Sequence, residues 1–204
     1  MATAGEMIKV IADAIARPQA TVTSYYAVLR KGGFISTTGR GRSAQHLSSL
    51  DAARILIVML SADSLQEGEA VTKLIGQLEH GHYDRAMNKL GKIQFEDALA
   101  SIIEFKADLL RGRVPPGESI LGDLRTNEIE VRVTATHLTA QIVVGGDESF
   151  FIDESGINPP IAYPDDWAEL PVEDRLVLRA IMEGMSVTRT IDHHVLSRIA
   201  GAMP

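Results

Sequence analysis

The chain has 204 residues, 45% of them hydrophobic, and a net charge of -7, enough for one substantial core or for two or three small packed units. It contains no cysteine, which excludes disulfides, thiolate metal ligands and cysteine nucleophiles. Its longest strongly apolar run, Ile55 to Leu60, is far too short to span a membrane, and its first residues lack a secretory signal, so we expect a cytoplasmic protein.

The charge is unevenly distributed along the chain. From Met1 to Arg54, seven basic and three acidic residues leave this segment at +4, so the remainder carries -11. Because phosphate binding is driven by lysine and arginine, the asymmetry suggests a basic binding head on an acidic body. The basic residues are Lys9, Arg17, Arg30, Lys31, Arg40, Arg42 and Arg54, and the acidic ones are Glu6, Asp13 and Asp51.

The first thirty residues predict two helices separated by a proline. Apolar residues at Ile8, Ile11, Ala12 and Ile15 have the spacing of an amphipathic helix over 7–16. Proline disfavours helical geometry in the residue before it, so Arg17-Pro18 ends this helix. A second helix then runs from position 19 or 20 to 31, where a glycine pair can close it.

A short hairpin and a third helix are expected next. Residues 34–37 have the composition of a strand, 38–42 form a glycine-containing tip and 45–47 could return as a second strand. Ser48, with Asp51 three residues later, resembles a capping box for an apolar helix over 50–61.

The rest of the chain divides at a proline-rich linker, Val114 to Gly117. Before it, helices are expected over 64–79 and 95–111, either as a small bundle or as an oligomerisation surface. After it we expect strands over 129–134, 139–144 and 149–152, a loop over 158–164, a helix over 173–183, a strand over 186–190 and a helix over 192–202. The predicted fold class is α+β, mainly α, with regions 1–62, 63–113 and 114–204.

The first two predicted helices carry a recognisable pattern. A small residue inside the first helix, Ala12, is followed by an aliphatic residue early in the second, Val22, and by another apolar position at Tyr25. This arrangement resembles the helix-turn-helix of bacterial and phage DNA-binding proteins, in which such residues pack the helices together. The family usually has glycine at the turn, where this chain has Ala16, and a wider turn through Arg17-Pro18 would compensate.

The resemblance implies that the second helix enters the major groove of DNA. Glutamine, threonine and serine there could bond base edges or phosphates, and alanine or a threonine methyl group could touch thymine. Of the two tyrosines, Tyr25 and Tyr26, we expect one buried and one at a phosphate. The DNA contacts implied on this helix are Gln19, Ala20, Thr21, Thr23, Ser24, Tyr26, Ala27, Arg30 and Lys31.

The loop after this helix adds a second basic element, Gly39-Arg40-Gly41-Arg42. Its order and spacing are similar to the basic wing of winged-helix proteins, so Arg40 and Arg42 are expected to contact the DNA backbone or its minor groove. The block from Thr21 to Leu60 also resembles helix-turn-helix proteins of phages and prophages.

Other signals point away from catalysis. His80 and His82 with Asp84, and His193-His194 beside Asp192, fall short of a metal-ligand set, so we interpret the first as a polar loop and the second as a capped helix start. Because phosphate loops, serine elbows and paired-carboxylate motifs do not occur, we expect no enzyme activity, metal or cofactor. Trp167 and Phe150-Phe151 are expected to fill a second core.

Three hypotheses follow. The first is a sequence-specific transcriptional regulator of phage or prophage type, dimeric or larger, because one small head seldom makes enough contacts. The second is a viral DNA-packaging recognition subunit resembling small terminase proteins, which would form a ring. The third is a helical adaptor without a DNA role. In the first, the acidic remainder would serve assembly and could bind an effector or a protein partner. In the second, the C-terminal β segment would contact the packaging motor, and in the third the head would pack on a partner.

Overall fold

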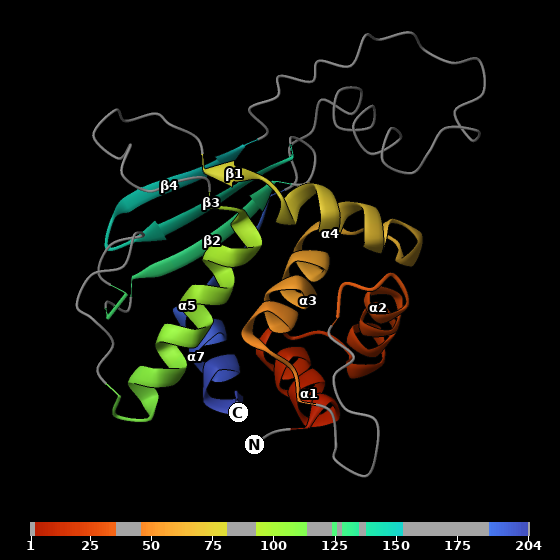
Figure 1. Cartoon of the computed structure of the whole chain (residues 1–204), viewed down its shortest axis with the longest axis horizontal. Helices are drawn as coiled ribbons and strands as arrows, with labels where there is room; N and C mark the ends of the chain where they lie inside the picture. The colour runs from red at the N-terminus through yellow and green to blue at the C-terminus, as the bar shows by residue number, and fades with distance from the viewer. Residues whose placement is uncertain are drawn as a thin grey trace, which may run out of the picture.

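The computed structural model of the chain describes residues 3–35, 46–80, 93–113, 124–125, 128–134, 138–152 and 188–203. It has an α+β fold in which helices predominate, as predicted (Figure 1). The helices are α1 (Ala4–Ala14), α2 (Gln19–Lys31), α3 (Ser49–Ser61), a 3-10 turn η1 (Leu65–Glu67), α4 (Gly68–Gly76), α5 (Phe95–Leu110) and α7 (His193–Ala202). The strands are β1 (Glu79–His80), β2 (Ile129–Thr134), β3 (Thr139–Val144), β4 (Asp147–Ile152) and β5 (Thr188–Asp192).

Side-chain caps define several helix starts. The predicted capping box of α3 is confirmed, since the Asp51 N–H donates to Ser48 Oγ (3.1 Å) and the Ser48 N–H donates to the Asp51 carboxylate (2.9 Å). Thr3 and Glu6 form a second box at α1. The predicted cap of α7 is also confirmed, because Asp192 accepts from the N–H groups of His194 and Val195. These bonds satisfy amide donors that have no partner in the first helical turn.

One antiparallel sheet contains the five strands in the order β1-β4-β3-β2-β5. The strands 129–134 and 139–144 pair as the antiparallel hairpin β2–β3, and the third strand expected over 149–152 begins earlier, at Asp147, and pairs with β3. The turn between β3 and β4 contains Gly145 and Gly146, whose φ values of 59° and 93° suit glycine. The last strand, β5, returns to pair with β2 rather than with the strand before it. The sheet therefore includes a pairing between two strands that lie far apart in the sequence.

The predicted helix 64–79 is wrong at its end. Helix α4 stops at Gly76, and Glu79 and His80 form β1, which pairs with β4. The Phe95 N–H donates to the Leu78 carbonyl (2.9 Å), so this carbonyl is bonded to the start of α5 instead of to a further helical turn. A local apolar pattern cannot reveal such a long-range acceptor.

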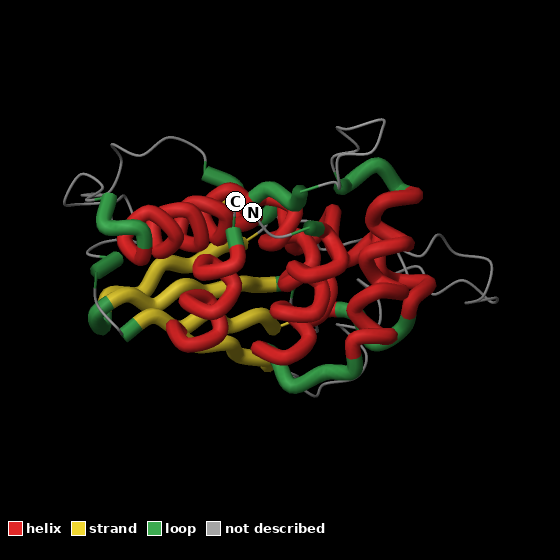
Figure 2. Tube along the Cα trace, turned by 90° about the horizontal axis from the view of Figure 1, so that it is seen from below, coloured by secondary structure: helices red, strands yellow, loops and turns green. Residues whose placement is uncertain are grey.

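The helices and the sheet share one hydrophobic core. Strand residues alternate between buried and partly exposed, and α5 and α7 lie over the same sheet face, with α1, α2 and α4 beyond its edge (Figures 1 and 2). The core draws side chains from all three predicted regions, such as Ile11, Ile103 and Ile142. The apolar stripe of α5 is thus buried within the chain. The division of the chain into the regions 1–62, 63–113 and 114–204 stays a prediction.

Several predicted features lie outside the described residues. These are the linker 114–117, the loop 158–164, the helix 173–183, Trp167, and the polar loop residues His82 and Asp84. Phe151 is buried as expected, but in the core that all three regions share rather than in a second core, and its ring centroid lies 5.3 Å from that of Phe95. Within the described ranges, every helix is too short or too polar to cross a membrane.

A buried hydroxyl at the end of α3 predicts a stabilising substitution. Ser61 is fully buried, and its Oγ has no hydrogen-bond partner among the described residues. Because a buried unpaired polar group is costly, Ser61→Ala should raise the free energy of unfolding by about 1 kcal/mol in urea denaturation. The control is Thr72→Val, since the equally buried Thr72 hydroxyl donates to the Gly68 carbonyl (2.7 Å) and its removal should cost about 1 kcal/mol. Destabilisation by Ser61→Ala would contradict the expectation.

Candidate nucleic-acid interface

The turn between α1 and α2 has the backbone conformation of a glycine turn. Ala16 takes a φ of 53°, in the left-handed region, and the Arg17 N–H donates to the Ala12 carbonyl (2.9 Å). This bond closes α1 in the manner of a Schellman motif. Pro18 then precedes α2, and its carbonyl accepts the N–H groups of Thr21 and Val22. The position at which the helix-turn-helix pattern usually has glycine is therefore the left-handed residue here.

Replacing this alanine tests the turn directly. A left-handed conformation costs a residue with a Cβ roughly 1–2 kcal/mol, so Ala16→Gly should stabilise the protein by about 0.5–1 kcal/mol after the extra flexibility of the unfolded chain is counted. Ala27→Gly, at an exposed position within α2, is the control and should destabilise it by about 1 kcal/mol. Thermal or urea denaturation of both variants measures the difference. A loss of stability in Ala16→Gly would rule out the left-handed turn.

Helix α2 is packed by one face and exposed on the other. Val22, Tyr25 and Leu29 are buried, which confirms the expectation that one of the two tyrosines is buried. Neighbouring helices surround this face, and α4 approaches closely because Gly68 has no side chain: a Cβ there would lie 3.3 Å from Val28 Cγ1. The packing holds α2 in one orientation.

The opposite face forms what we call the α2 stripe. Successive residues of a helix are about 100° apart, and the exposed residues of α2 fall within one arc of about 120°. The stripe consists of Gln19, Ala20, Thr23, Ala27, Arg30 and Lys31. Two amide or hydroxyl groups and two cations therefore share one accessible surface, with small residues between them.

Three predicted contacts lie outside the stripe. Ser24 and Tyr26 are partly buried and border it on either side. Thr21 lies about 80° beyond the edge of the stripe, on the flank that it shares with Val28, which contacts α4. The prediction for Thr21 followed from its place in the sequence, whereas helical geometry separates it from the other six side chains.

The two hydroxyl groups near the stripe are already engaged as donors. Thr23 Oγ1 donates to the Gln19 carbonyl (2.8 Å) and Ser24 Oγ donates to the Ala20 carbonyl (2.9 Å). Each oxygen retains lone pairs. In this conformation they can accept a hydrogen bond from a base amino group, while the threonine methyl group offers an apolar contact.

The residues on either side of 36–45 differ from the predicted hairpin. Phe34, Ile35, His46 and Leu47 were expected within strands, yet none of them is in a strand. Ile35 and Leu47 are instead buried in the core. The predicted wing residues Arg40 and Arg42 lie outside the described residues.

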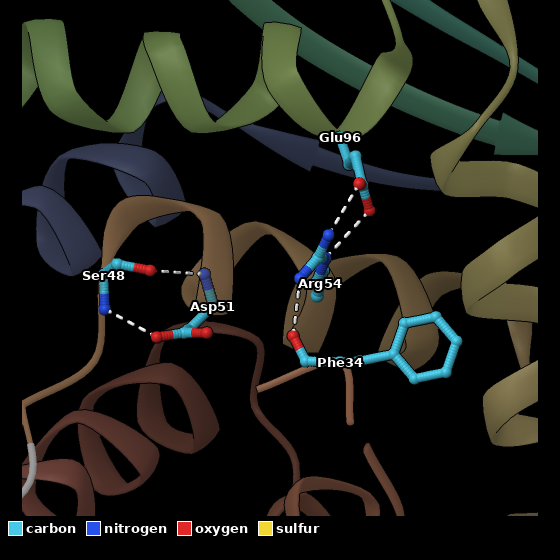
Figure 3. A network of polar contacts seen from close by, with 5 residues as sticks. All are labelled: Phe34, Ser48, Asp51, Arg54 and Glu96. Atoms are coloured by element: carbon cyan, nitrogen blue, oxygen red, sulfur yellow. Dashed lines mark hydrogen bonds and ion pairs between the residues drawn. The ribbon is translucent and has the colours of Figure 1, made fainter. Parts of the chain in front are cut away.

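An internal arginine explains the start of this loop. Arg54 Nη1 donates to the Phe34 carbonyl (2.6 Å), so this carbonyl is unavailable to a strand partner (Figure 3). The same guanidinium binds the Glu96 carboxylate through Nε (2.9 Å) and Nη2 (2.8 Å), which raises the pKa of Arg54. Arg54 belongs to the basic segment 1–54, but its guanidinium is bonded to Glu96 and to the Phe34 carbonyl inside the protein.

Acidic groups lie close to α2 as well. Burial raises the pKa of Tyr25, and the carboxylates of Glu67 and Asp63 raise it further. The Glu69 carboxyl group lies against the helix end, since a Cβ at Gly32 would be 2.7 Å from Glu69 Cδ. The positive charge of the α2 stripe thus comes from Arg30 and Lys31, and the Glu69 carboxyl group lies near the C-terminal end of α2.

One contact that supports α1 had no signal in the sequence. Arg198 of α7 donates to the Asp13 carbonyl near the end of α1 (3.0 Å). A cation at a helix C-terminus is favourable, and this bond joins the last helix of the chain to the first. The separation of 185 residues explains why no local pattern indicates it.

The described residues contain no cluster of three or more groups suited to hold a metal ion. The rings of His193 and His194 lie 3.8 Å apart at the capped start of α7. Comparison of the chain with protein-family models, curated proteins and solved structures finds no match. The function is therefore inferred from the geometry of α1 and α2.

Proposed function

We propose that this protein binds double-stranded DNA, with the α2 stripe in the major groove. The observation that carries the proposal is the stripe itself, an exposed helix face with two polar and two basic side chains, preceded by a turn in which Ala16 has a left-handed conformation. An α-helix fits the major groove, where donors and acceptors distinguish the four base pairs. Gln19 and Thr23 would contact bases, and Arg30 and Lys31 would contact phosphates.

The packing around α2 supports this role. A recognition helix must be held at a defined angle, and α2 contacts α1, α3 and α4 through its buried face. Helix α1 is itself held by α7 through Arg198. In the proposal, Arg40 and Arg42 extend the contact to the neighbouring backbone or minor groove.

We further propose that the protein is a transcriptional regulator of phage or prophage type that acts as a dimer in the cytoplasm. The packaging-subunit hypothesis used the predicted helical middle as a ring interface. No observation favours it, because α5 is mostly buried against α3 and α7 within one chain. Two copies of the head would bind half-sites one helical turn apart.

A salt-dependent titration tests DNA binding. The full chain is titrated with a labelled mixed-sequence duplex of about thirty base pairs at several salt concentrations, by fluorescence anisotropy. The variant Arg30→Ala/Lys31→Ala removes two exposed cations of the stripe. If both contact phosphates, the slope of log affinity against log salt should become shallower by about two. Arg40→Ala/Arg42→Ala should act in the same direction.

The matched control is Arg113→Ala. Arg113 is an exposed cation just beyond α5, whose C-terminal end lies on the opposite side of the molecule from α2 (Figure 1). This variant should leave the slope unchanged. Gln19→Ala should instead lower the ratio between the affinities for a selected site and for a random site more than it lowers the overall affinity for DNA. Absence of salt-dependent binding in the parent protein would favour the adaptor hypothesis, whereas equal slopes in all variants would show that neither the stripe nor the loop arginines contact the DNA backbone.

A further inference from the structure

A pocket of about 530 Å³ lies beneath the turn that joins α1 and α2. Four elements surround it: the turn itself, the C-terminal half of α3, the strand β5 and the first turn of α7. Pockets of 300–1,000 Å³ enclose small organic molecules. The dimensions suit a compact ligand rather than a folded partner.

Most of the pocket lining is apolar. Leu56, Leu60 and Ile191 belong to the hydrophobic core and form part of its wall, and Ile15 and Val195 add partly buried side chains. An apolar ring or short chain placed there would be removed from water. This transfer supplies affinity but no orientation.

Three charged residues line the same pocket, and two of them are already bonded within the chain. Arg189 donates to the Leu60 carbonyl (3.0 Å) and to the Asp63 carboxylate. The Asp192 carboxylate accepts the two N–H groups at the start of α7, which orient it but leave its negative charge in place. Arg17 is exposed, and no described residue forms an ion pair or side-chain hydrogen bond with it. The guanidinium of Arg17 is therefore the lining cation that is available to an anionic group.

We infer that this pocket binds a small amphipathic anion, an apolar ring or chain that carries one carboxylate, sulfonate or phosphate group. The guanidinium of Arg17 would bind the anionic group, because its planar donors match these oxyanions. The apolar wall would bind the body of the ligand. The site is independent of the proposed DNA binding, since none of the six residues of the α2 stripe lines it.

Two fluorescent probes of similar shape test the inference without DNA. Anilinonaphthalene sulfonate has aromatic rings and one anionic group, and N-phenylnaphthylamine has the rings alone. The sulfonate should bind the full chain saturably, with one probe per chain. Arg17→Gln should weaken the sulfonate about tenfold, because a charge-assisted hydrogen bond is lost, and leave the neutral probe unchanged.

Two further variants make the result specific to this pocket. Lys9→Gln removes an exposed cation of α1 outside the pocket and should not alter either affinity. Ala14→Leu extends a lining side chain into the space and should weaken both probes. The inference is overturned if the sulfonate does not saturate at one site, if Lys9→Gln and Arg17→Gln weaken it equally, or if Ala14→Leu leaves both affinities unchanged.

Discussion

Replacing Arg54 with methionine is expected to lower the free energy of unfolding by about 3–5 kcal/mol. The Arg54 side chain is 22% exposed and that of Glu96 only 10%, so the substitution leaves a largely buried carboxylate without its cation. It also removes the donor to the Phe34 carbonyl. The carboxylate has little room to move toward solvent on the α4 side, where a Cβ at Gly76 would be 2.8 Å from Glu96 Oε2.

A double substitution separates the ion pair from the surrounding packing. Arg54→Met/Glu96→Leu removes both charges and should recover most of the loss, to within about 1–2 kcal/mol of the parent protein, because apolar residues of similar volume can replace a buried pair. The control is Arg132→Met. Arg132 forms the same two-bond contact with Glu130, but both side chains are 37% exposed, so the loss of stability should be much smaller than at Arg54. Equal losses at the two arginines in urea denaturation would refute this account.

Truncating Phe95 to alanine is expected to cost about 3–5 kcal/mol. Phe95 is fully buried at the start of α5, and its ring meets that of Phe151 in β4 at an interplanar angle of 57°. The substitution therefore creates a cavity between a helix and the sheet. Aromatic pairs in such tilted arrangements contribute about 0.5–1.5 kcal/mol beyond their buried area.

Substitutions that remove different side-chain volumes test how the loss of stability depends on the size of this cavity. Phe95→Leu retains most of the volume and should cost less than half as much as Phe95→Ala, while Leu110→Ala at a side chain that is 59% exposed should change stability by less than about 0.5 kcal/mol. Urea denaturation followed by circular dichroism measures all three. A loss below 1 kcal/mol for Phe95→Ala would mean that α5 and β4 do not share a tightly packed core.

Local sequence patterns predicted a large part of this structure. The helices around Ile11, Val22 and Ile103 and the strands around Val131 and Ile142 occur where their apolar periods placed them. These patterns are reliable because residues three or four apart share a helix face and alternate residues share a sheet face, whatever lies opposite. The exposed polar face of α2 follows from the same rule.

The errors occurred where a partner was distant in sequence. Glu79 lies in the strand β1, which pairs with β4, and not in the predicted helix. Phe34 was expected in a strand, but its carbonyl accepts a hydrogen bond from Arg54. In each case the competing contact lies on another element.

The sequence by itself determined most of the helices, the central strands β2 and β3, the caps of α3 and α7, and that Gln19, Thr23 and Arg30 share one helix face. Only the tertiary structure decided that Arg54 serves the interior, that β5 pairs with β2, and that Arg17 borders a pocket. Helical and strand periods arise from bonds between near neighbours, whereas these three features require residues dozens of positions apart to meet, and their meeting depends on the packing of the whole chain.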